Sequence, residues 1–379
     1  MKEYIWQQNQ WPQFSWNSEV LLIPLASARK KQGAFLEAMS RLGFEESLEA
    51  WSKVMEEDTI QTSAIEGEKL DREGVRSSVA EHLGVPSAGF CGSNRKIDGI
   101  VQILCDAVHN RDTPLDEMCI KTWHKNLFPD GYSGFHTVHA GEWRSTDMQV
   151  ISGPIGRQKI HYIAPPPERI AQEMATFFLW WETSKSELDG LIRSALAHLY
   201  FVSIHPFDDG NGRIARALSD MALAQDEKTG RRFYSMSAQI MEERRMYYEI
   251  LEKTQKGNGD CTEWLLWFIG CFERAITEAS EIAKIITFKS TFWVAIKDIP
   301  LSERQRKVLN ILLDAGKDGF EGGLTTRKYV GMTKVSRATA WREIEDLVEK
   351  GILRQLDKGG RSTAYEVNWA IQCSGYPQP

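Results

Sequence analysis

The stretch His205-Pro206-Phe207-Asp208-Asp209-Gly210-Asn211-Gly212-Arg213-Ile214-Ala215-Arg216 decides how this chain is interpreted. Apolar residues recur at helical spacing before it, from Leu191 to Val202, and after it, from Ile214 to Met221. The stretch is therefore predicted to be a loop that leads into the N-terminus of a helix. Backbone N–H groups at such a terminus have no partner within the helix and carry positive partial charge. We expect this loop to bind an anion.

The side chains of the loop indicate phosphate chemistry. Its two glycines allow the backbone to approach an anion closely, and Arg213 and Arg216 lie on one helix face, where both can bind phosphate oxygens. Asp209 offers a hard oxygen ligand that suits Mg²⁺. His205 is the only nearby group that can accept a proton at neutral pH. An ordinary polar turn is the alternative for any Asp-Gly or Asn-Gly pair, but the combination of these groups between two helices favours a polyphosphate site.

The composition describes an ordinary folded chain. The 379 residues are 42% hydrophobic and 26% charged with a net charge of −6, which excludes a disordered protein. The six cysteines have no metal-ligand spacing and are interpreted as reduced core residues. The N-terminus lacks the apolar region of a secretory signal, and no apolar run approaches the roughly 20 residues of a membrane span. We expect a cytoplasmic protein that contacts no membrane.

The central part of the chain reads as a bundle of helices. Apolar spacing with a period of 3.6 runs from about residue 96 to residue 289. Inside it, the segment 147–163 predicts a β-hairpin. Its apolar residues Val150 and Ile151 are separated from residues 160–163 by the turn-forming run Ser152-Gly153-Pro154-Ile155-Gly156. Before it, an aromatic opening with Trp6, Trp11 and Trp16 predicts a packed extended arm that precedes further helices.

The region 300–369 has a different character. It contains a helical pattern, a second short segment with a turn at 331–334, a helix that Ser336 can cap, and two short strands. This is the order of a winged helix. Thirteen basic and ten acidic side chains give the region a charge of +3, against −9 for the rest of the chain. Candidates for contact with DNA are Lys334, Arg337, Thr339, Arg342, Lys358 and Arg361. Contact with protein is an equal alternative, because Glu343, Glu345 and Asp346 lie in the same helix.

The loop from His205 to Arg216 resembles, at every specified position, the signature of the Fic family of nucleotidyltransferases, His-x-Phe-x-(Asp or Glu)-Gly-Asn-Gly-Arg-x-x-Arg. The resemblance implies a mainly α fold. It places a helical N-terminal domain at residues 1–90, a Fic helical bundle with a β-hairpin flap at 91–290, and a winged helix-turn-helix domain at 300–370. It also implies transfer of AMP from ATP to a hydroxyl group of a protein, with release of pyrophosphate.

The resemblance further implies a role for each residue of the signature. His205 would be the general base and Asp209 the ligand of Mg²⁺, with Mn²⁺ as an alternative metal. Asn211, Gly210 and Gly212 would bind the α- and β-phosphates, and Arg213 and Arg216 the outer phosphates. The hairpin resembles the Fic flap and places Val150, Ile151, Ser152 and Gly153 beside the nucleotide and the target segment. Tyr247 and Tyr248 resemble a tyrosine pair of the adenine pocket. A plain surface hairpin and core packing are the respective alternatives.

A second match is regulatory. Thr62-Ser63-Ala64-Ile65-Glu66-Gly67 fits the family's inhibitory pattern (Ser or Thr)-x-x-x-Glu-(Gly or Asn). Thr62 and Glu66 are one helical turn apart, and Gly67 can end the helix. A carboxylate at Glu66 is therefore expected to pair with Arg216 and to occupy the space of the γ-phosphate. A surface glutamate before a helix-ending glycine is the alternative.

Two classes of function follow. The first is an autoinhibited protein adenylyltransferase that modifies an unknown target protein, itself, or both. The second is a nucleotide-sensing transcriptional regulator that binds DNA through 300–370. Within the first class, removal of AMP and use of UTP or another nucleotide stay open. By analogy with relatives we expect a homodimer.

Overall fold

The computed structural model describes residues 4–84, 94–153, 157–356 and 363–371. The α-helices are α1 (Ser18–Ser40), α2 (Phe44–Ile65), α3 (Arg72–Leu83), α4 (Arg95–His109), α5 (Glu117–Leu127), α6 (Ile170–Glu187), α7 (Gly190–Ile204), α8 (Asn211–Glu227), α9 (Met236–Glu242), α10 (Arg244–Gln255), α11 (Thr262–Ala295), α12 (Glu303–Gly319), α13 (Thr326–Thr333) and α14 (Arg337–Glu349). The 3₁₀ turns are η1 (Ile5–Gln7) and η2 (Pro167–Arg169), and the strands are β1 (Tyr132–Ser133), β2 (His136–Thr137), β3 (Gln149–Ser152), β4 (Lys159–Ile163), β5 (Leu353–Gln355) and β6 (Tyr365–Val367). The fold is mainly helical, as expected.

The chain forms two compact units, Met1–Ala279 and Ser280–Pro379. Helix α11 begins in the first unit, and its last turns belong to the second. The domain boundary expected near residue 90 stays a prediction.

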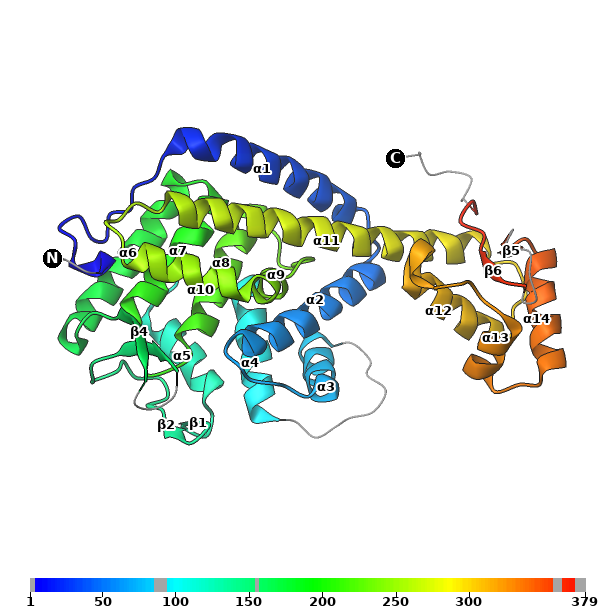
Figure 1. The fold of residues 1–379 in the computed structure, drawn as a ribbon, viewed down its shortest axis with the longest axis horizontal. Helices are drawn as coiled ribbons and strands as arrows, with labels where there is room; N and C mark the ends of the chain where they lie inside the picture. The colour runs from blue at the N-terminus through cyan, green and yellow to red at the C-terminus, as the bar shows by residue number, and fades with distance from the viewer. Residues whose placement is uncertain (1–3, 85–93, 154–156, 357–362, 372–379) are drawn as a thin grey trace. The chain divides into compact units, whose positions relative to one another are not determined.

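Helices α7 and α8 form the centre of the first unit (Figure 1). Every residue of α7 from Leu191 to Ile204 is buried, because most of the helix is apolar and its few polar side chains, such as Arg193 and Ser194, are hydrogen-bonded within the core. The facing side of α8 is buried as well, and the Ser194 hydroxyl donates to the Ser219 carbonyl across the pair, at 2.9 Å. The loop between the two helices is thus held at both ends by the most deeply buried part of the unit.

The aromatic opening packs on this centre, as the sequence predicted, although part of it is a 3₁₀ turn. The indole of Trp6 donates to the Ile163 carbonyl at 2.8 Å, and that of Trp11 donates to the Glu173 carboxylate at 2.7 Å. The ring of Trp11 meets the edge of Tyr200 on α7, with 5.1 Å between ring centroids. The opening therefore connects the base of the hairpin to the core.

Helix α1 lies along α11, as Figure 1 shows. The Ser27 hydroxyl donates to the Glu273 carboxylate at 2.9 Å, and Lys31 pairs with the same carboxylate at 2.8 Å. Helix α2 follows and packs against α9, α3 and α4. Its C-terminus thereby reaches the start of α8.

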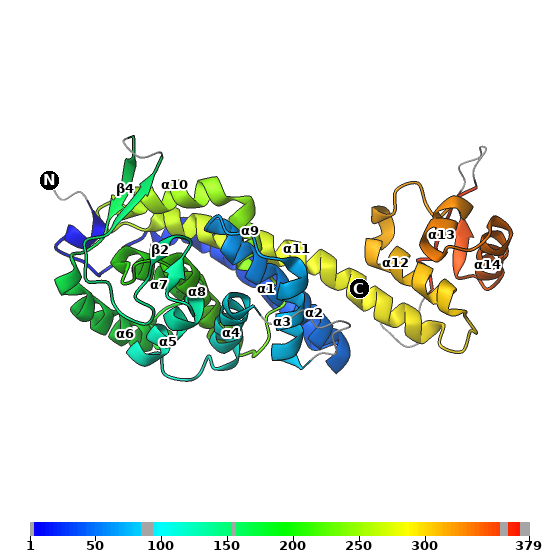
Figure 2. The same ribbon diagram turned by 90° about the horizontal axis from the view of Figure 1, so that it is seen from below.

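Strands β3 and β4 pair antiparallel as the expected hairpin, with a bulge between Val150 and Ile151. The hairpin projects from the helices beside α10 (Figure 2). Its tip, residues 154–156, lies outside the described residues. The strand pair is short and two-stranded, so its position depends on contacts with α10.

The second unit has its own apolar core, in which α12, α13 and α14 pack with the antiparallel pair β5–β6. The turn is shorter than the predicted range 331–334. Helix α13 continues to Thr333, because Lys334 alone takes the left-handed conformation that ends it. Ser336 caps α14 as expected, and its hydroxyl accepts from the Thr339 N–H at 3.2 Å. Lys358 and Arg361 lie outside the described residues, and the winged-helix assignment stays a prediction.

Two expectations about the whole chain can be compared with the described residues. There, no helix is long and apolar enough to cross a membrane. Cys105, Cys119, Cys261 and Cys271 are free thiols. Cys91 and Cys373 lie outside the described residues.

One glycine in the bundle provides a test of packing. A Cβ atom at Gly99 on α4 would stand 1.8 Å from the Asn126 carbonyl oxygen at the end of α5. We predict that Gly99→Ala lowers the free energy of unfolding by about 1–3 kcal/mol, because rigid backbone must move. Gly33→Ala on α1 is the matched control, since nothing lies within 4 Å of its Cβ position. Thermal unfolding of the two variants checks this, and equal melting temperatures would contradict it.

Candidate active site

The loop between α7 and α8 is fastened by its own side chains. Phe207 is fully buried and stacks on the imidazole of His124, with 3.8 Å between ring centroids and 4° between ring planes. The Asn211 amide accepts from the Phe207 N–H at 3.0 Å and donates to the Phe207 carbonyl at 2.9 Å. Phe207 points inward, as expected. The Asn211 side chain is occupied by the loop itself, so its phosphate contact is limited to the backbone N–H.

Two glycines of the loop have different surroundings. Gly210 has φ of +79°, and a Cβ there would stand 2.9 Å from Phe128, so it faces α5 and supplies a turn. Gly212 lines the open side of the loop at the first turn of α8. Only Gly212 therefore offers the close approach that the sequence predicted for both.

His205 ends α7 in the left-handed conformation, with φ of +51°. Its Nδ1 lies 3.1 Å from the Val202 carbonyl. A carbonyl oxygen only accepts, so Nδ1 carries the proton of the neutral ring and Nε2 holds the free lone pair. Burial is the main cause that lowers the pKa of His205 to about 4; the Arg144 guanidinium acts in the same direction, and the hydrogen bond to Val202 and the carboxylates of Asp209 and Glu66 act against it. The ring is therefore neutral at physiological pH.

Arg144 is a buried residue that fastens the histidine to the hairpin. Its guanidinium donates to the carbonyls of His205 at 2.7 Å, Thr146 at 2.7 Å and Pro165 at 2.5 Å. Thr146 and Pro165 flank the hairpin on either side. Arg144 is not among the site residues that the sequence predicted. Two of its three carbonyl partners, His205 and Pro165, lie far from it in the sequence, so no local pattern indicates these contacts.

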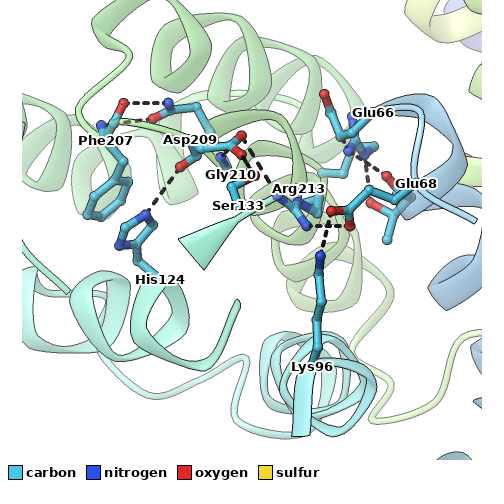
Figure 3. Close-up of polar contacts among 12 residues, drawn as sticks. Glu66, Glu68, Lys96, His124, Ser133, Phe207, Asp209, Gly210 and Arg213 are labelled. Atoms are coloured by element: carbon cyan, nitrogen blue, oxygen red, sulfur yellow. Dashed lines mark hydrogen bonds and ion pairs between the residues drawn. The ribbon is translucent and has the colours of Figure 1, made fainter. Parts of the chain in front are cut away.

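Asp209 is held by partners that the sequence did not indicate. Its carboxylate accepts from the Ser133 hydroxyl at 2.5 Å and from the Gly210 N–H at 2.5 Å. His124 accepts from the Gly141 N–H at its Nδ1, so its Nε2 donates to the Asp209 carbonyl, at 3.2 Å. Figure 3 shows Ser133 and His124 reaching Asp209 from two sides.

The single carboxylate of Asp209 is compatible with a divalent cation such as Mg²⁺. Among the residues that the structure describes, no group of three or more His, Cys, Asp or Glu side chains is placed to hold a metal ion. Mg²⁺ is commonly bound by one or two carboxylates together with substrate phosphates. A single carboxylate beside a phosphate cradle meets that requirement.

A cleft of about 890 Å³ opens beside the loop. The hairpin contributes Val150, Ile151 and Ser152, the loop contributes His205, Asp209 and Gly212, and the helices contribute Glu66, Tyr247 and Tyr248. The structure thus brings together residues that the sequence placed in the site from separate segments. Gly153 is not among the lining residues; its φ of +96° serves the turn of the hairpin.

The two tyrosines occupy different positions in the cleft wall. Tyr247 is buried, and its hydroxyl lies 2.9 Å from His198 Nε2 in the core. Tyr248 is 38% exposed and its ring lies under the Arg244 guanidinium. Tyr248 therefore offers the accessible ring, whereas Tyr247 supports it from behind.

The tip side of the hairpin is connected to α10 by a hydrogen-bond chain. Ser152 Oγ lies 2.6 Å from His161 Nε2, and His161 Nδ1 lies 2.5 Å from the Glu252 carboxylate. Burial opposes ionisation of Glu252, but hydrogen bonds from Lys256 and His161 outweigh it and lower its pKa to about 2. An ionised Glu252 accepts from Nδ1, which fixes the hairpin over the cleft.

The C-terminus of α2 meets α8 inside the same cleft. Arg216 donates to the Glu66 carboxylate at 2.7 Å and to the Thr62 hydroxyl at 2.8 Å. A Cβ atom on Gly212 would stand only 2.3 Å from the Glu66 carboxylate oxygen. Glu66 therefore lies directly against the first turn of α8, and Gly67, with φ of +87°, turns the chain away.

Residues 114–223 match the Fic/DOC family, and residues 4–85 match a domain of unknown function, DUF4172. The matched segment contains the whole loop from His205 to Arg216. The chain therefore contains a Fic domain.

The relatives of this Fic domain include named transferases. A protein adenylyltransferase Fic from Nematostella vectensis is 27% identical over 218 residues, which are 57% of this chain and 46% of the relative. A uridine 5'-monophosphate transferase from Xanthomonas campestris is 46% identical over 67 residues, which are 16% of this chain and 12% of the relative. The chain thus spans about half or less of the length of these relatives.

A solved structure supports the fold. A Fic family protein from Desulfovibrio desulfuricans aligns with a TM-score of 0.53 and 19% identity, and covers 95% of this chain and 97% of that one. At this identity the likeness concerns the fold alone. The expected Fic fold is confirmed, whereas the roles of the individual residues stay predictions.

The protonation state of the Fic histidine can be measured directly. We predict that the His205 ring stays neutral in an NMR titration from pH 8 down to pH 5, because its pKa is lowered to about 4. His139 is the internal control, since its hydrogen bond to Asp208 raises its pKa above the ordinary value. His205→Gln assigns the signal. Protonation of His205 near pH 6.5 would contradict the view that the buried ring is neutral and able to accept a proton over this pH range.

Proposed function

We propose that the chain is a protein adenylyltransferase that transfers AMP from ATP to a hydroxyl group of a protein. The observation that carries the proposal is the neutral His205, whose Nε2 lone pair is free at the cleft beside the N-terminus of α8. A base and an anion-binding helix terminus in one cleft are what attack by a hydroxyl on a phosphate requires. The named relatives support the same reaction class.

The proposed step uses this chain's residues as follows. The target hydroxyl attacks the α-phosphorus of ATP and gives its proton to His205 Nε2. The bond to the β-phosphate oxygen breaks, and pyrophosphate leaves with the electron pair. Mg²⁺, held by Asp209, would neutralise phosphate charge. Arg213, Arg216 and the first N–H groups of α8 stabilise the leaving group, so that positioning and electrostatics supply most of the catalysis.

We further propose that Glu66 inhibits this transfer. Its carboxylate already occupies Arg216 and the space over Gly212, where a phosphate of ATP would otherwise bind. Arg216 is 2% exposed, so its ion pair with Glu66 is little weakened by solvent. ATP must either displace Glu66 or bind in a nonproductive position.

The test is a pair of substitutions. We predict that Glu66→Gly raises AMP transfer at least about fivefold and that His205→Ala lowers it by about 10²–10⁴-fold. Labelling with α-labelled ATP and Mg²⁺, read by mass spectrometry on target proteins and on the chain itself, checks both.

The controls are Glu81→Gly on α3 and His82→Ala, which change the same residue types outside the cleft. Parallel reactions with UTP identify the nucleotide, since one relative is named a uridine 5'-monophosphate transferase. If the Glu66→Gly and His205→Ala variants both labelled protein at the wild-type level, the assignment of the active site would be wrong. Release of AMP from a labelled protein, without transfer, would instead favour removal of AMP.

A second function is supported by the charges of α14. Two of the three acidic residues that argued against DNA contact are neutralised by ion pairs, since Glu343 pairs with Arg304 and Asp346 pairs with Lys350. The third, Glu345, accepts a hydrogen bond from the Tyr365 hydroxyl. Among the described residues, the exposed Lys334, Arg337 and Arg342 form no ion pair. We propose that this unit contacts DNA or another polyanion through that basic side.

Salt dependence tests this second function. We predict that Arg337→Ala combined with Arg342→Ala weakens binding to duplex DNA in a gel shift and reduces the salt slope by about 2, because two phosphate contacts are lost. Arg306→Ala on α12 is the control. Binding that is absent in the wild type, or insensitive to salt and to both arginines, would leave protein contact as the role of this unit.

A further inference from the structure

A second carboxylate from the same segment reaches α8. Glu68, two residues after Glu66, pairs with Arg213 at 3.1 Å through one oxygen and with Lys96 at 2.5 Å through the other. Figure 3 shows the Glu68 carboxylate between these two cations. Its position follows from the left-handed Gly67, after which the Glu68 N–H returns to the Ser63 carbonyl at 3.0 Å.

Contacts other than the Glu68 ion pair also hold Arg213 in place. Its side chain is 2% exposed, and its guanidinium lies over the Phe128 ring at 5.1 Å. Its Nε is buried and has no hydrogen-bond partner among the described residues. The Asp209 carboxylate is 3.8 Å away, so Glu68 is the main counter-ion. A buried guanidinium without an anion is costly, and the site therefore needs an anion whether or not Glu68 is present.

Lys96 lies on the other side of the same carboxylate. It is in the first turn of α4, where Asn94 caps the helix. It is about one-third exposed, and the only anion it contacts among the described residues is Glu68. No feature of α4 itself requires a lysine here, because positive charge is unfavourable at a helix N-terminus.

We propose that Lys96 and Arg213 form an anion subsite for one of the nucleotide phosphates beyond the α-phosphate, which Glu68 occupies as a built-in substitute. This rests on the proposed function. The Glu68 carboxylate marks where an oxyanion between the two cations would stand. The segment after α2 thus supplies two carboxylates to two arginines of α8, Glu66 to Arg216 and Glu68 to Arg213. Nucleotide with three phosphates must displace both.

The alternative is a purely structural bridge between the segment after α2 and helix α4. A bridge would affect all ligands alike, and its loss would lower the melting temperature. A subsite instead separates ligands by their phosphates. Removal of the Glu68 charge should strengthen binding of ATP and pyrophosphate but leave AMP binding unchanged, since AMP has no phosphate beyond the α-phosphate.

The experiment is calorimetric titration of the full chain with ATP, AMP and pyrophosphate. We predict that Glu68→Gln strengthens ATP and pyrophosphate binding about tenfold, the value of one charge-assisted contact. In the Glu68→Gln background, Lys96→Met should weaken both about tenfold, again without an effect on AMP. Glu49→Gln and Lys53→Met, which remove an exposed pair on α2, are the matched controls.

The outcomes separate the two proposals. Equal effects on ATP and AMP, or no effect of Glu68→Gln, would overturn the subsite while the transfer reaction of Glu66→Gly could still proceed. Weaker ATP binding in Glu68→Gln, with a lower melting temperature, would establish the structural bridge instead. If ATP bound to no variant, the proposed function would fail together with the subsite.

Discussion

The structure of the site depends on the burial of α7 against α8. An apolar helix that is buried on every side cannot shift without loss of core packing, so its end at His205 is fixed. The loop that follows is short and is held internally by Asn211 and Phe207. The first N–H groups of α8 therefore point into the cleft at a constant distance from the histidine. Catalysis by positioning needs this constancy, because small displacements of the reacting groups cost much of the rate.

The buried positive charges of α8 are neutralised by carboxylates of the same chain. Two buried arginines of α8 would be unstable alone, and the segment after α2 provides a carboxylate for each. Under the proposed function, the stability of the folded chain and the binding of a polyphosphate compete for the same cations. An inhibitory segment would then be tightly packed and yet displaceable, because the ligand supplies the negative charge that the displaced segment removes.

Much of this could be predicted from the sequence, and the rest has physical reasons for being missed. The loop and its flanking helices follow from local periodicity and glycine positions, whereas the Glu66–Arg216 contact was expected from the resemblance of residues 62–67 to the family's inhibitory pattern. The motif predicts that Asn211 binds phosphate, because a motif specifies the residue type but not its partners. In the structure, the Asn211 side chain is hydrogen-bonded to the backbone of Phe207, four residues earlier. Ser133 lies in a strand of two residues, too short for any periodic pattern. Lys96 meets Glu68 only because Gly67 turns the chain, and a single positive φ leaves little trace in a sequence.

The central claim is that the helix terminus behind Glu66 is a nucleotide phosphate site in reach of His205. A crystal structure of the Glu66→Gly variant with a non-hydrolysable ATP analogue and Mg²⁺ tests it most directly. The account predicts phosphate oxygens at the N–H groups of the first turn of α8, and an α-phosphorus facing His205 Nε2 with room for an attacking hydroxyl at about 3–3.5 Å. A nucleotide bound away from α8, with Arg216 free of phosphate, would contradict it.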